Sequence, residues 1–200
     1  DDTFGSLEQG ADFKLAAALS AEGQFEEAAK AFMSYLEKFD GSDNENLALY
    51  NAANNYQLAG KNELSNQLFE RYIAEYPTDS RSEALYWRIA QNYEGILELN
   101  RAVDYYENLY RNFPEGVNAP AALYNSGFLR VGMGDYVGAA ENFEVYVDRF
   151  PAKSDIETAY WFAGEQWARV GDDEVMAWRN RYLRRFPDAE PDHVIEVLYD

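Results

Sequence analysis

Apolar residues recur along this chain at intervals of three and four positions, which is the spacing of one face of an α-helix. The clearest run lies between Asp135 and Phe150, and its apolar positions are Tyr136, Ala139, Ala140, Phe143, Tyr146, Val147 and Phe150. A half-buried strand would instead alternate every second residue. The pattern therefore predicts a helix from Asp135 to Phe150, preceded by a helix from about Ala119 to Val131 that ends at Gly132-Met133-Gly134.

The same pattern returns with a fixed period. An aromatic residue closes each copy, and the copies are 37, 37, 37 and 36 residues apart, at Phe39, Tyr76, Phe113, Phe150 and Phe186. Proline follows the aromatic residue in the last four copies, and Asp40 follows it in the first. Small residues keep the same period at Ala16, Ala53, Ala90, Gly127 and Gly164, and a turn position keeps it at Gly23, Gly60, Leu97, Gly134 and Gly171. Such agreement between columns indicates repeated copies of one helical hairpin.

The period divides the chain into five units of two helices each. They are expected at residues 6–40, 43–77, 80–114, 117–151 and 154–187, with a partial sixth unit at 191–200. Helix starts are expected where serine stands three positions before Gln or Glu, because this pair can satisfy the free N–H groups of a first turn; the serines are Ser6, Ser42, Ser80 and Ser154. A single helix pair has too small a core to be stable, so the copies must stack. The sequence therefore predicts one all-α solenoid.

These columns resemble the tetratricopeptide repeat over residues 8–187. The resemblance rests on the small residues of the first helix, Gly134-Asp135-Tyr136 at the turn, Ala139, Phe143 and the closing Pro151. It implies a right-handed solenoid of antiparallel helix pairs whose first helices line a concave groove. The usual period of the family is about 34 residues. The longer period and the aromatic-proline close are similar to bacterial cell-envelope members, such as the lipoprotein of the outer-membrane β-barrel assembly machinery and the Tol-Pal accessory protein.

The resemblance implies that the concave groove is formed by three columns, that is, three sets of equivalent positions on the first helices. The outermost column is aromatic and the inner two are of mixed chemistry. The predicted groove residues are Phe13, Tyr50, Asn54, Gln57, Trp87, Gln91, Glu94, Tyr124, Phe128, Trp161 and Glu165. Rings supply contact area at low entropy cost and amides bond a peptide backbone, so the groove suits an extended peptide or a partner helix. The alternative is that the rings only pack between neighbouring repeats.

Two further candidate sites are weighed against simpler interpretations. The family's clamp for chaperone carboxylate ends needs several basic and amide residues; only Asn51 and Arg88 match, while Phe13 and Ala17 stand where Lys and Asn are required, so the clamp is rejected. Arginines also gather in the last unit, at Arg169, Arg179, Arg181, Arg184 and Arg185. They form either a patch for an acidic partner or, as we favour, a solvated ridge that pairs with the acidic neighbouring repeat.

The charge of the chain limits its partners. Lys and Arg number 17 and Asp and Glu 36, a formal net charge of -19 that repels phosphate backbones and excludes nucleic-acid binding. A protein partner is expected to carry a basic or amphipathic segment, and its association should slow as salt rises. Adaptation to high salt is the competing reason for the acidity. The 47% hydrophobic content excludes a disordered acidic segment.

Candidate chemistry is sparse. His193 is the only histidine and forms with Glu196 at most half of a metal site, and there is no cysteine to complete it. The segment Asp40–Glu45 resembles a calcium loop but lacks its central glycine and its closing glutamate, and Gly132-x-Gly134 follows no strand. Paired carboxylates leave a glycan-acting enzyme as a distant alternative. We therefore expect no enzyme activity, no metal and no cofactor.

Together these features predict a non-enzymatic scaffold that binds another protein in its groove, within a bacterial envelope assembly. The alternative is a spacer whose repeats set a distance inside a longer protein. The expected location is the periplasm, with the cytoplasm as the alternative. No run approaches the roughly 20 apolar residues of a membrane span, so no insertion is expected. The start at Asp1, without methionine, suggests a mature fragment, and we expect it to be monomeric in isolation.

Overall fold

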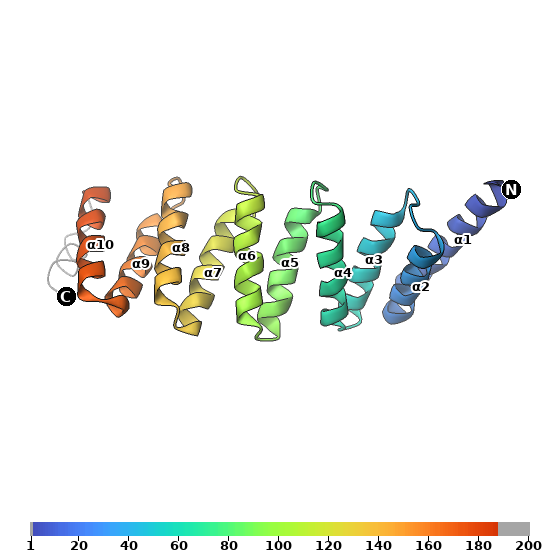
Figure 1. The fold of residues 1–200 in the computed structure, drawn as a ribbon, viewed down its shortest axis with the longest axis horizontal. Helices are drawn as coiled ribbons and strands as arrows, with labels where there is room; N and C mark the ends of the chain where they lie inside the picture. The colour runs from blue at the N-terminus through green and yellow to red at the C-terminus, as the bar shows by residue number, and fades with distance from the viewer. Residues whose placement is uncertain (1, 188–200) are drawn as a thin grey trace. The chain divides into compact units, whose positions relative to one another are not determined.

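The computed structural model describes residues 2–187, with side chains from Gly5 onward, and these residues form α-helices joined by short turns (Figure 1). Ten helices and no strand occur in this range, which confirms the predicted all-α repeat fold. The first helices of the hairpins are α1 (Asp2–Ala21), α3 (Glu45–Leu58), α5 (Ser82–Gly95), α7 (Ala119–Met133) and α9 (Ile156–Val170). The second helices are α2 (Phe25–Lys38), α4 (Asn62–Glu75), α6 (Leu99–Asn112), α8 (Tyr136–Arg149) and α10 (Asp172–Arg185). The predicted partial unit at 191–200 and His193 lie outside the described residues.

The chain divides into two compact units, one up to Asn92 and the other from Tyr93 onward. In the first unit α1 packs against α2, α2 against α3, and α3 against α4. In the second unit α6 packs against α7, α7 against α8, α8 against α9, and α9 against α10. Within each unit these helices lie beside their neighbours in sequence, so one hairpin stacks on the next.

The aromatic residue that closes each repeat ends a helix. The residues concerned are Phe39, Tyr76, Phe113, Phe150 and Phe186, and each donates its backbone N–H to the carbonyl four positions earlier at 2.8 to 2.9 Å. After the first four, the residue three positions on donates back to the aromatic carbonyl, which forms a tight turn. Proline suits the position after the aromatic residue because it has no N–H to satisfy and its fixed φ matches such a turn.

The serine motifs do not mark helix starts, and that prediction is wrong. The helix α1 continues through Ser6, and the later first helices begin beyond their serines, at Glu45, Ser82 and Ile156. The tight turn occupies the intervening residues, so the serine groups are used differently. The Ser42 hydroxyl lies 3.2 Å from the Tyr35 hydroxyl, and the Glu45 carboxylate accepts the Gly41 N–H at 3.0 Å.

The core of each hairpin combines buried rings with small residues. Buried aromatic side chains of the second helices are Phe32, Tyr35, Phe69, Tyr72, Tyr106, Phe143, Tyr146, Trp178 and Tyr182. The small residues of the first helices face them, and Ala16, Ala53 and Ala90 are fully buried. A Cβ added to Gly127 would lie 2.9 Å from the Phe143 ring. The periodic small column therefore exists because a ring lies against the helix there.

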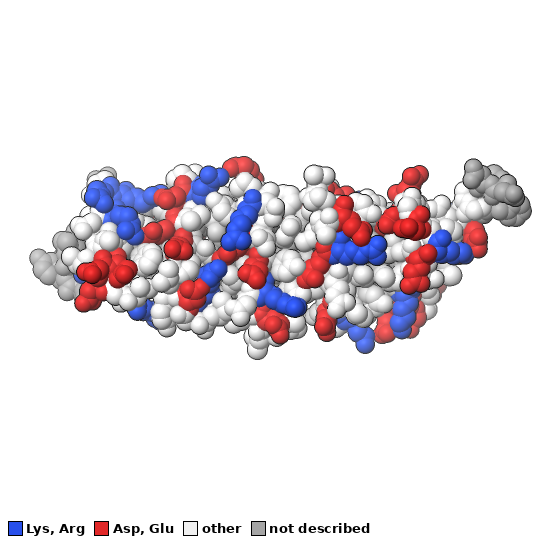
Figure 2. All heavy atoms as spheres, in the orientation of Figure 1, with Lys and Arg blue, Asp and Glu red and all other residues white. Residues whose placement is uncertain are grey.

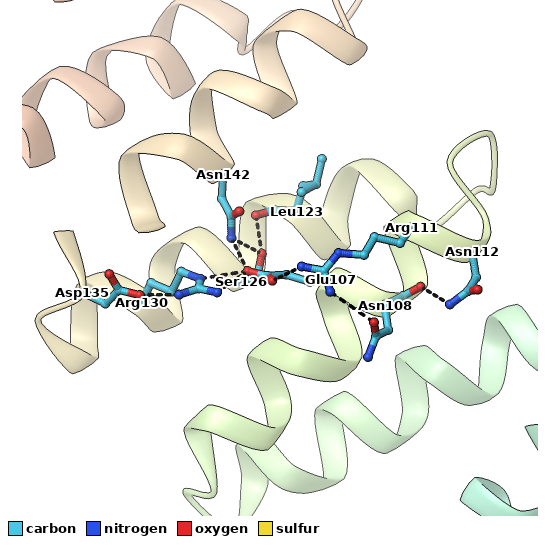
Figure 3. Close-up of polar contacts among 9 residues, drawn as sticks. All are labelled: Glu107, Asn108, Arg111, Asn112, Leu123, Ser126, Arg130, Asp135 and Asn142. Atoms are coloured by element: carbon cyan, nitrogen blue, oxygen red, sulfur yellow. Dashed lines mark hydrogen bonds and ion pairs between the residues drawn. The ribbon is translucent and has the colours of Figure 1, made fainter. Parts of the chain in front are cut away.

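A buried carboxylate joins the third and fourth hairpins (Figure 3). Glu107 of α6, whose side chain is 8% exposed, pairs with Arg130 of α7, with N–O distances of 2.8 and 2.7 Å. Its Oε1 also accepts a hydrogen bond from Asn142 of α8 at 2.9 Å, and Arg111 of its own helix bonds Oε2 at 2.8 Å. Asn142 in turn donates to Ser126 at 2.9 Å. One acidic side chain thus connects three successive helices.

The turns inside the first four hairpins each contain a left-handed residue, whereas Gly171 in the fifth is extended. Gly23, Gly60 and Gly134 have φ of 78°, 73° and 78°, and Leu97 occupies the same position with φ of 63°. This conformation brings the Cβ of an L-residue too close to the backbone. Packing of the Leu97 side chain does not offset this strain, because the side chain is 80% exposed.

Replacing Leu97 with glycine is expected to stabilise the protein by about 0.5 to 1 kcal/mol. Relief of left-handed strain, about 1 to 2 kcal/mol, outweighs the backbone entropy that glycine loses on folding. The matched control is Leu64→Gly, which alters a leucine on α4 that is 43% exposed and should destabilise by about 1 kcal/mol. Urea denaturation followed by circular dichroism measures both, and a destabilised Leu97→Gly variant would contradict the prediction.

Candidate functional site

The predicted aromatic column is half-buried in the described structure. Phe13, Tyr50, Trp87, Tyr124 and Trp161 each keep part of the ring accessible. Four of them pack against two rings of their own second helix, for example Phe13 on Phe32 and Tyr35 with centroid distances of 5.3 and 5.4 Å. The rings therefore serve mainly to hold their own hairpin together, and only their outer edges are open to a partner.

The most accessible of the three predicted columns is the middle one. Gln91, Phe128 and Glu165 are exposed, and Asn54 is partly exposed. In the inner column Glu94 is already engaged, because it accepts the Tyr106 hydroxyl at 2.9 Å. The sequence predicted which residues share a face, whereas the structure shows which of them are free to contact another molecule.

A polar cluster forms in the unit up to Asn92. Arg88 of α5 reaches back over α3, where it donates to Asn54 Oδ1 at 2.9 Å and to Tyr50 Oη at 3.4 Å, and it also bonds Gln57 Oε1. Its guanidinium lies 4.7 Å from the centroid of the Phe69 ring. These three acceptors are neutral. They orient the guanidinium but do not neutralise its positive charge.

Buried amides hold this polar cluster in place. Gln57 Nε2 donates to Asn92 Oδ1 at 2.8 Å, and Asn92 Nδ2 donates to Asn66 Oδ1 at 2.7 Å. Asn66 is fully buried and Asn92 nearly so. An amide whose other end is bonded to buried groups keeps one orientation, so the surface presented by Asn54, Gln57 and Arg88 is preorganised.

An aromatic cluster forms in the unit from Tyr93 onward. The Phe128 ring of α7 lies 4.9 Å from Tyr124, 5.1 Å from Phe143 and 5.2 Å from Phe162 of α9. Phe128 is nonetheless 42% exposed. Phe162 was not among the predicted groove residues. Phe162 occupies the repeat position equivalent to Arg88, directly after the outermost column. This fourth column therefore also contributes to the face.

The arginines of the last hairpin divide into paired and unpaired members. Arg181 pairs with Glu144 and Arg185 with Asp148, both at 2.5 Å and both across to α8 of the preceding repeat. Arg169 lies over the Tyr136 ring at 5.1 Å. In Figure 2 basic side chains gather over α10 beside acidic ones. The last arginines, Arg184 included, line a hollow of about 360 Å³ together with Glu144, Asp148 and Tyr160.

Buried tyrosines donate to carboxylates in the second unit. The Tyr146 hydroxyl donates to Asp155 and the Tyr182 hydroxyl to Glu157, each at 2.8 Å. Burial, reinforced by these negative acceptors, raises the pKa of both phenols above the ordinary value. Burial likewise raises the pKa of Tyr72 to about 12.

The contribution of these tyrosines to stability is therefore expected to be complete up to about pH 10 and to fall above it. The phenol pKa is higher in the folded chain than in the unfolded chain, so the stabilisation is complete below the unfolded value and disappears as pH rises through the folded value. Urea denaturation at a series of pH values measures this. The variant Tyr146→Phe should show a shallower alkaline loss; an unchanged slope, or phenolate absorbance that develops without loss of helix, would contradict the prediction.

No group of three or more potential metal ligands is present among residues 2–187. Within the same range no helix has the length and apolar character needed to span a bilayer. The accessible groups of the described face include the Gln91 amide, the Phe128 ring and the Glu165 carboxylate, with Asn54 and Arg88 partly exposed.

Stacked helical hairpins with an accessible face on their first helices define the class of helical-repeat proteins. The family model of the tetratricopeptide repeat matches residues 11–42, 47–79, 83–116 and 121–152. The chain belongs to the tetratricopeptide repeat family. The fifth hairpin, α9 with α10, is present in the structure beyond the four matched segments.

Solved structures share the fold at low sequence identity. A tetratricopeptide repeat protein from Parabacteroides merdae ATCC 43184 matches with a TM-score of 0.57 and 15% identity, covering 94% of this chain and 70% of that one. A MamA protein matches with a TM-score of 0.52 and 17% identity, covering 96% and 95%. MamA from Desulfovibrio magneticus RS-1 matches with a TM-score of 0.50 and 19% identity, covering 73% and 77%. No curated protein matches the chain.

Proposed function

We propose that this chain is a non-enzymatic scaffold that binds a peptide or a partner helix on the face formed by its first helices. Proteins of the tetratricopeptide repeat family are in general protein-interaction scaffolds, which supports the class of function. The observation that carries the proposal is Phe128, a ring that is 42% exposed although three packed aromatic residues, Tyr124, Phe143 and Phe162, surround its base. An aromatic side chain on a rigid, partly apolar platform is typical of a binding hot spot.

The two clusters offer different chemistry, each within its own unit. The rings of Tyr124, Phe128 and Phe162 form an apolar surface that a bulky side chain of a partner can contact. Asn54, Gln57 and Arg88 offer amide groups and a cation, which bond backbone carbonyls and polar side chains. With a net charge of -19, the protein should attract a basic or amphipathic segment. Each cluster is preorganised by packed or buried neighbours, so little entropy is lost when a partner binds.

The proposal is tested by removing the exposed ring. Peptides selected from a displayed random library on the wild-type protein serve as probes, and titration calorimetry measures their affinities. Phe128→Ser is expected to weaken binding at least about tenfold, because a hot-spot ring is lost. Val137→Ser is the matched control, since Val137 is 43% exposed but lies on the second helix α8.

Equal affinities for wild type and Phe128→Ser would contradict the proposal, provided that circular dichroism shows both to be folded. Failure to select any peptide would favour the spacer alternative, which is supported by the packing of the aromatic column within its own hairpins. Binding that does not slow with added salt would contradict the expected basic character of the partner.

The proposed location is the bacterial cell envelope, with the cytoplasm as the alternative. Its support is the 37-residue period with aromatic-proline closes, which resembles the envelope members of the family. Fractionation of the source cell with an antibody against the chain tests this. Recovery with periplasmic markers would support the envelope, and recovery with cytosolic markers would contradict it.

A further inference from the structure

The carboxylate of Glu94 has a neutral partner but no positive one. Glu94 lies in the last turn of α5, belongs to the unit from Tyr93 onward and is partly exposed. Its Oε2 accepts the Tyr106 hydroxyl at 2.9 Å, and no Lys or Arg of the described residues forms an ion pair with it. The tyrosine occupies one carboxylate oxygen, so Oε1 remains as an acceptor and the negative charge is not compensated.

Buried groups fix the orientation of this carboxylate. Tyr106 of α6 is fully buried, and the Asn125 side chain of α7 also hydrogen-bonds its hydroxyl. Burial raises the pKa of Tyr106, so the hydroxyl stays protonated at neutral pH and continues to donate to Glu94. A carboxylate that is already oriented loses little entropy when it binds a ligand.

The helical hairpin does not need this polar pair for its packing. The residues equivalent to Tyr106 in three other hairpins are buried phenylalanines, namely Phe32, Phe69 and Phe143. The positions equivalent to Glu94 in the second, fourth and fifth repeats hold Gln57, Val131 and Ala168. Burying a hydroxyl costs free energy unless it is hydrogen-bonded, and a ring without one packs at the same site elsewhere in the chain. The Tyr106–Glu94 pair is therefore an addition to the common framework, which favours a role in recognition.

The carboxylate adjoins the apolar surface of the same unit. Asn125, which bonds the same hydroxyl as Glu94, precedes Phe128 by three positions on α7. Residues three apart are neighbours on one side of a helix. Glu94 and the exposed Phe128 ring therefore lie close enough for one short peptide to contact both.

We propose that the partner presents a lysine or arginine side chain to Glu94 and an apolar side chain to the Phe128 ring. The inference rests on the proposed function and adds the residue that selects for positive charge. The net charge of -19 attracts basic segments to the whole protein but does not choose a position for them. An oriented carboxylate does so, because a hydrogen bond between two charged groups is stronger than one between neutral groups.

Peptide selection on three proteins tests the proposal. A displayed random library is selected on wild type, on Glu94→Gln and on the matched control Glu141→Gln, which removes the same charge from an exposed position on the second helix α8. Lysine and arginine should be enriched at one peptide position with wild type and with Glu141→Gln, and this enrichment should be lost with Glu94→Gln. No enrichment, or equal enrichment on all three proteins, would overturn the proposal.

Calorimetry with a selected peptide measures the contact itself. Replacing the basic residue of the peptide with alanine should weaken binding to wild type at least about tenfold, but binding to Glu94→Gln less than about threefold. Circular dichroism checks that Glu94→Gln is folded, as expected because glutamine still offers an acceptor to Tyr106. Equal losses on both proteins would show that Glu94 does not bind the cation. If Phe128→Ser weakens binding and Glu94→Gln does not, the proposed function stands and this inference fails.

Tyr106 is a positioning residue in this arrangement, and Tyr106→Phe tests that role. The ring still packs as phenylalanine does in the other hairpins, but the carboxylate loses its buried donor. The preference for the basic peptide over its alanine variant should fall, while the affinity for the alanine variant stays unchanged. A preference equal to that of wild type would show that the tyrosine does not position the carboxylate.

Discussion

Replacing Glu107 with alanine is expected to lower the free energy of unfolding by about 3 kcal/mol. The carboxylate binds Arg130 and Asn142 from the next repeat, and its removal leaves Arg130, whose side chain is 23% exposed, without its main partner (Figure 3). Breaking a buried ion pair from one side costs about 3 to 5 kcal/mol, and the lower value applies because Arg130 keeps its pairing with Asp135. Urea denaturation monitored by circular dichroism measures the change.

Two comparisons separate burial from charge in this prediction. Glu26→Ala removes an exposed carboxylate paired with Lys30 on the same helix and should leave stability nearly unchanged, because exposed pairs are screened by water and ions. The double variant Glu107→Leu/Arg130→Leu should recover at least half of the loss, since an apolar pair leaves no buried charge unpaired. A Glu107→Ala variant as stable as wild type would show that the network does not hold the hairpins together.

Replacing Trp178 with alanine is expected to destabilise the last hairpin by about 3 to 5 kcal/mol. Trp178 is 3% exposed, donates its indole N–H to the Tyr160 carbonyl at 3.1 Å, and packs on Tyr182 with a centroid distance of 5.3 Å. Its ring fills the space beside Gly164, where an added Cβ would overlap it. Trp161 and Trp167 lie in the same hairpin, so tryptophan fluorescence during urea denaturation measures the loss locally when Trp87 of the other unit is replaced by phenylalanine in both proteins.

A double-mutant cycle tests whether Gly164 and Trp178 are fitted to each other. Gly164→Leu alone should destabilise by about 2 kcal/mol or more through overlap with the ring. In Trp178→Ala/Gly164→Leu the leucine enters the vacated space, so the combined loss should fall short of the sum by at least about 1 kcal/mol. Additive losses would contradict the fit.

Much of the fold follows from the repeated columns. The helix that contains Tyr136 and Phe143 was predicted at 135–150 and observed at Tyr136–Arg149, and the preceding helix ends at Met133, before Gly134. These agree because apolar spacing and glycine act over one or two turns of chain. The serine motifs failed because Ser42 and its equivalents lie in a tight turn set by the preceding aromatic residue, and that turn outweighs the local capping signal.

The candidate site was predictable only in part. Repeat register predicted that Tyr50, Asn54 and Phe128 belong to the first-helix face. It did not predict that Arg88 crosses from α5 to orient Asn54 and Gln57, because that contact joins residues more than thirty positions apart. Phe162 was missed for the same reason, since its neighbour Phe128 lies on a different helix.

The sequence by itself determined the helical period, the five hairpins of residues 2–187 and the residues that share each face, because these depend on spacing along one chain. Only the tertiary structure decided which members of a face remain accessible: Phe128 is exposed, whereas Glu94 is engaged by Tyr106. Accessibility depends on what neighbouring helices cover, and helices far apart in sequence supply that cover. Equivalent residues can therefore be engaged in one repeat and accessible in another.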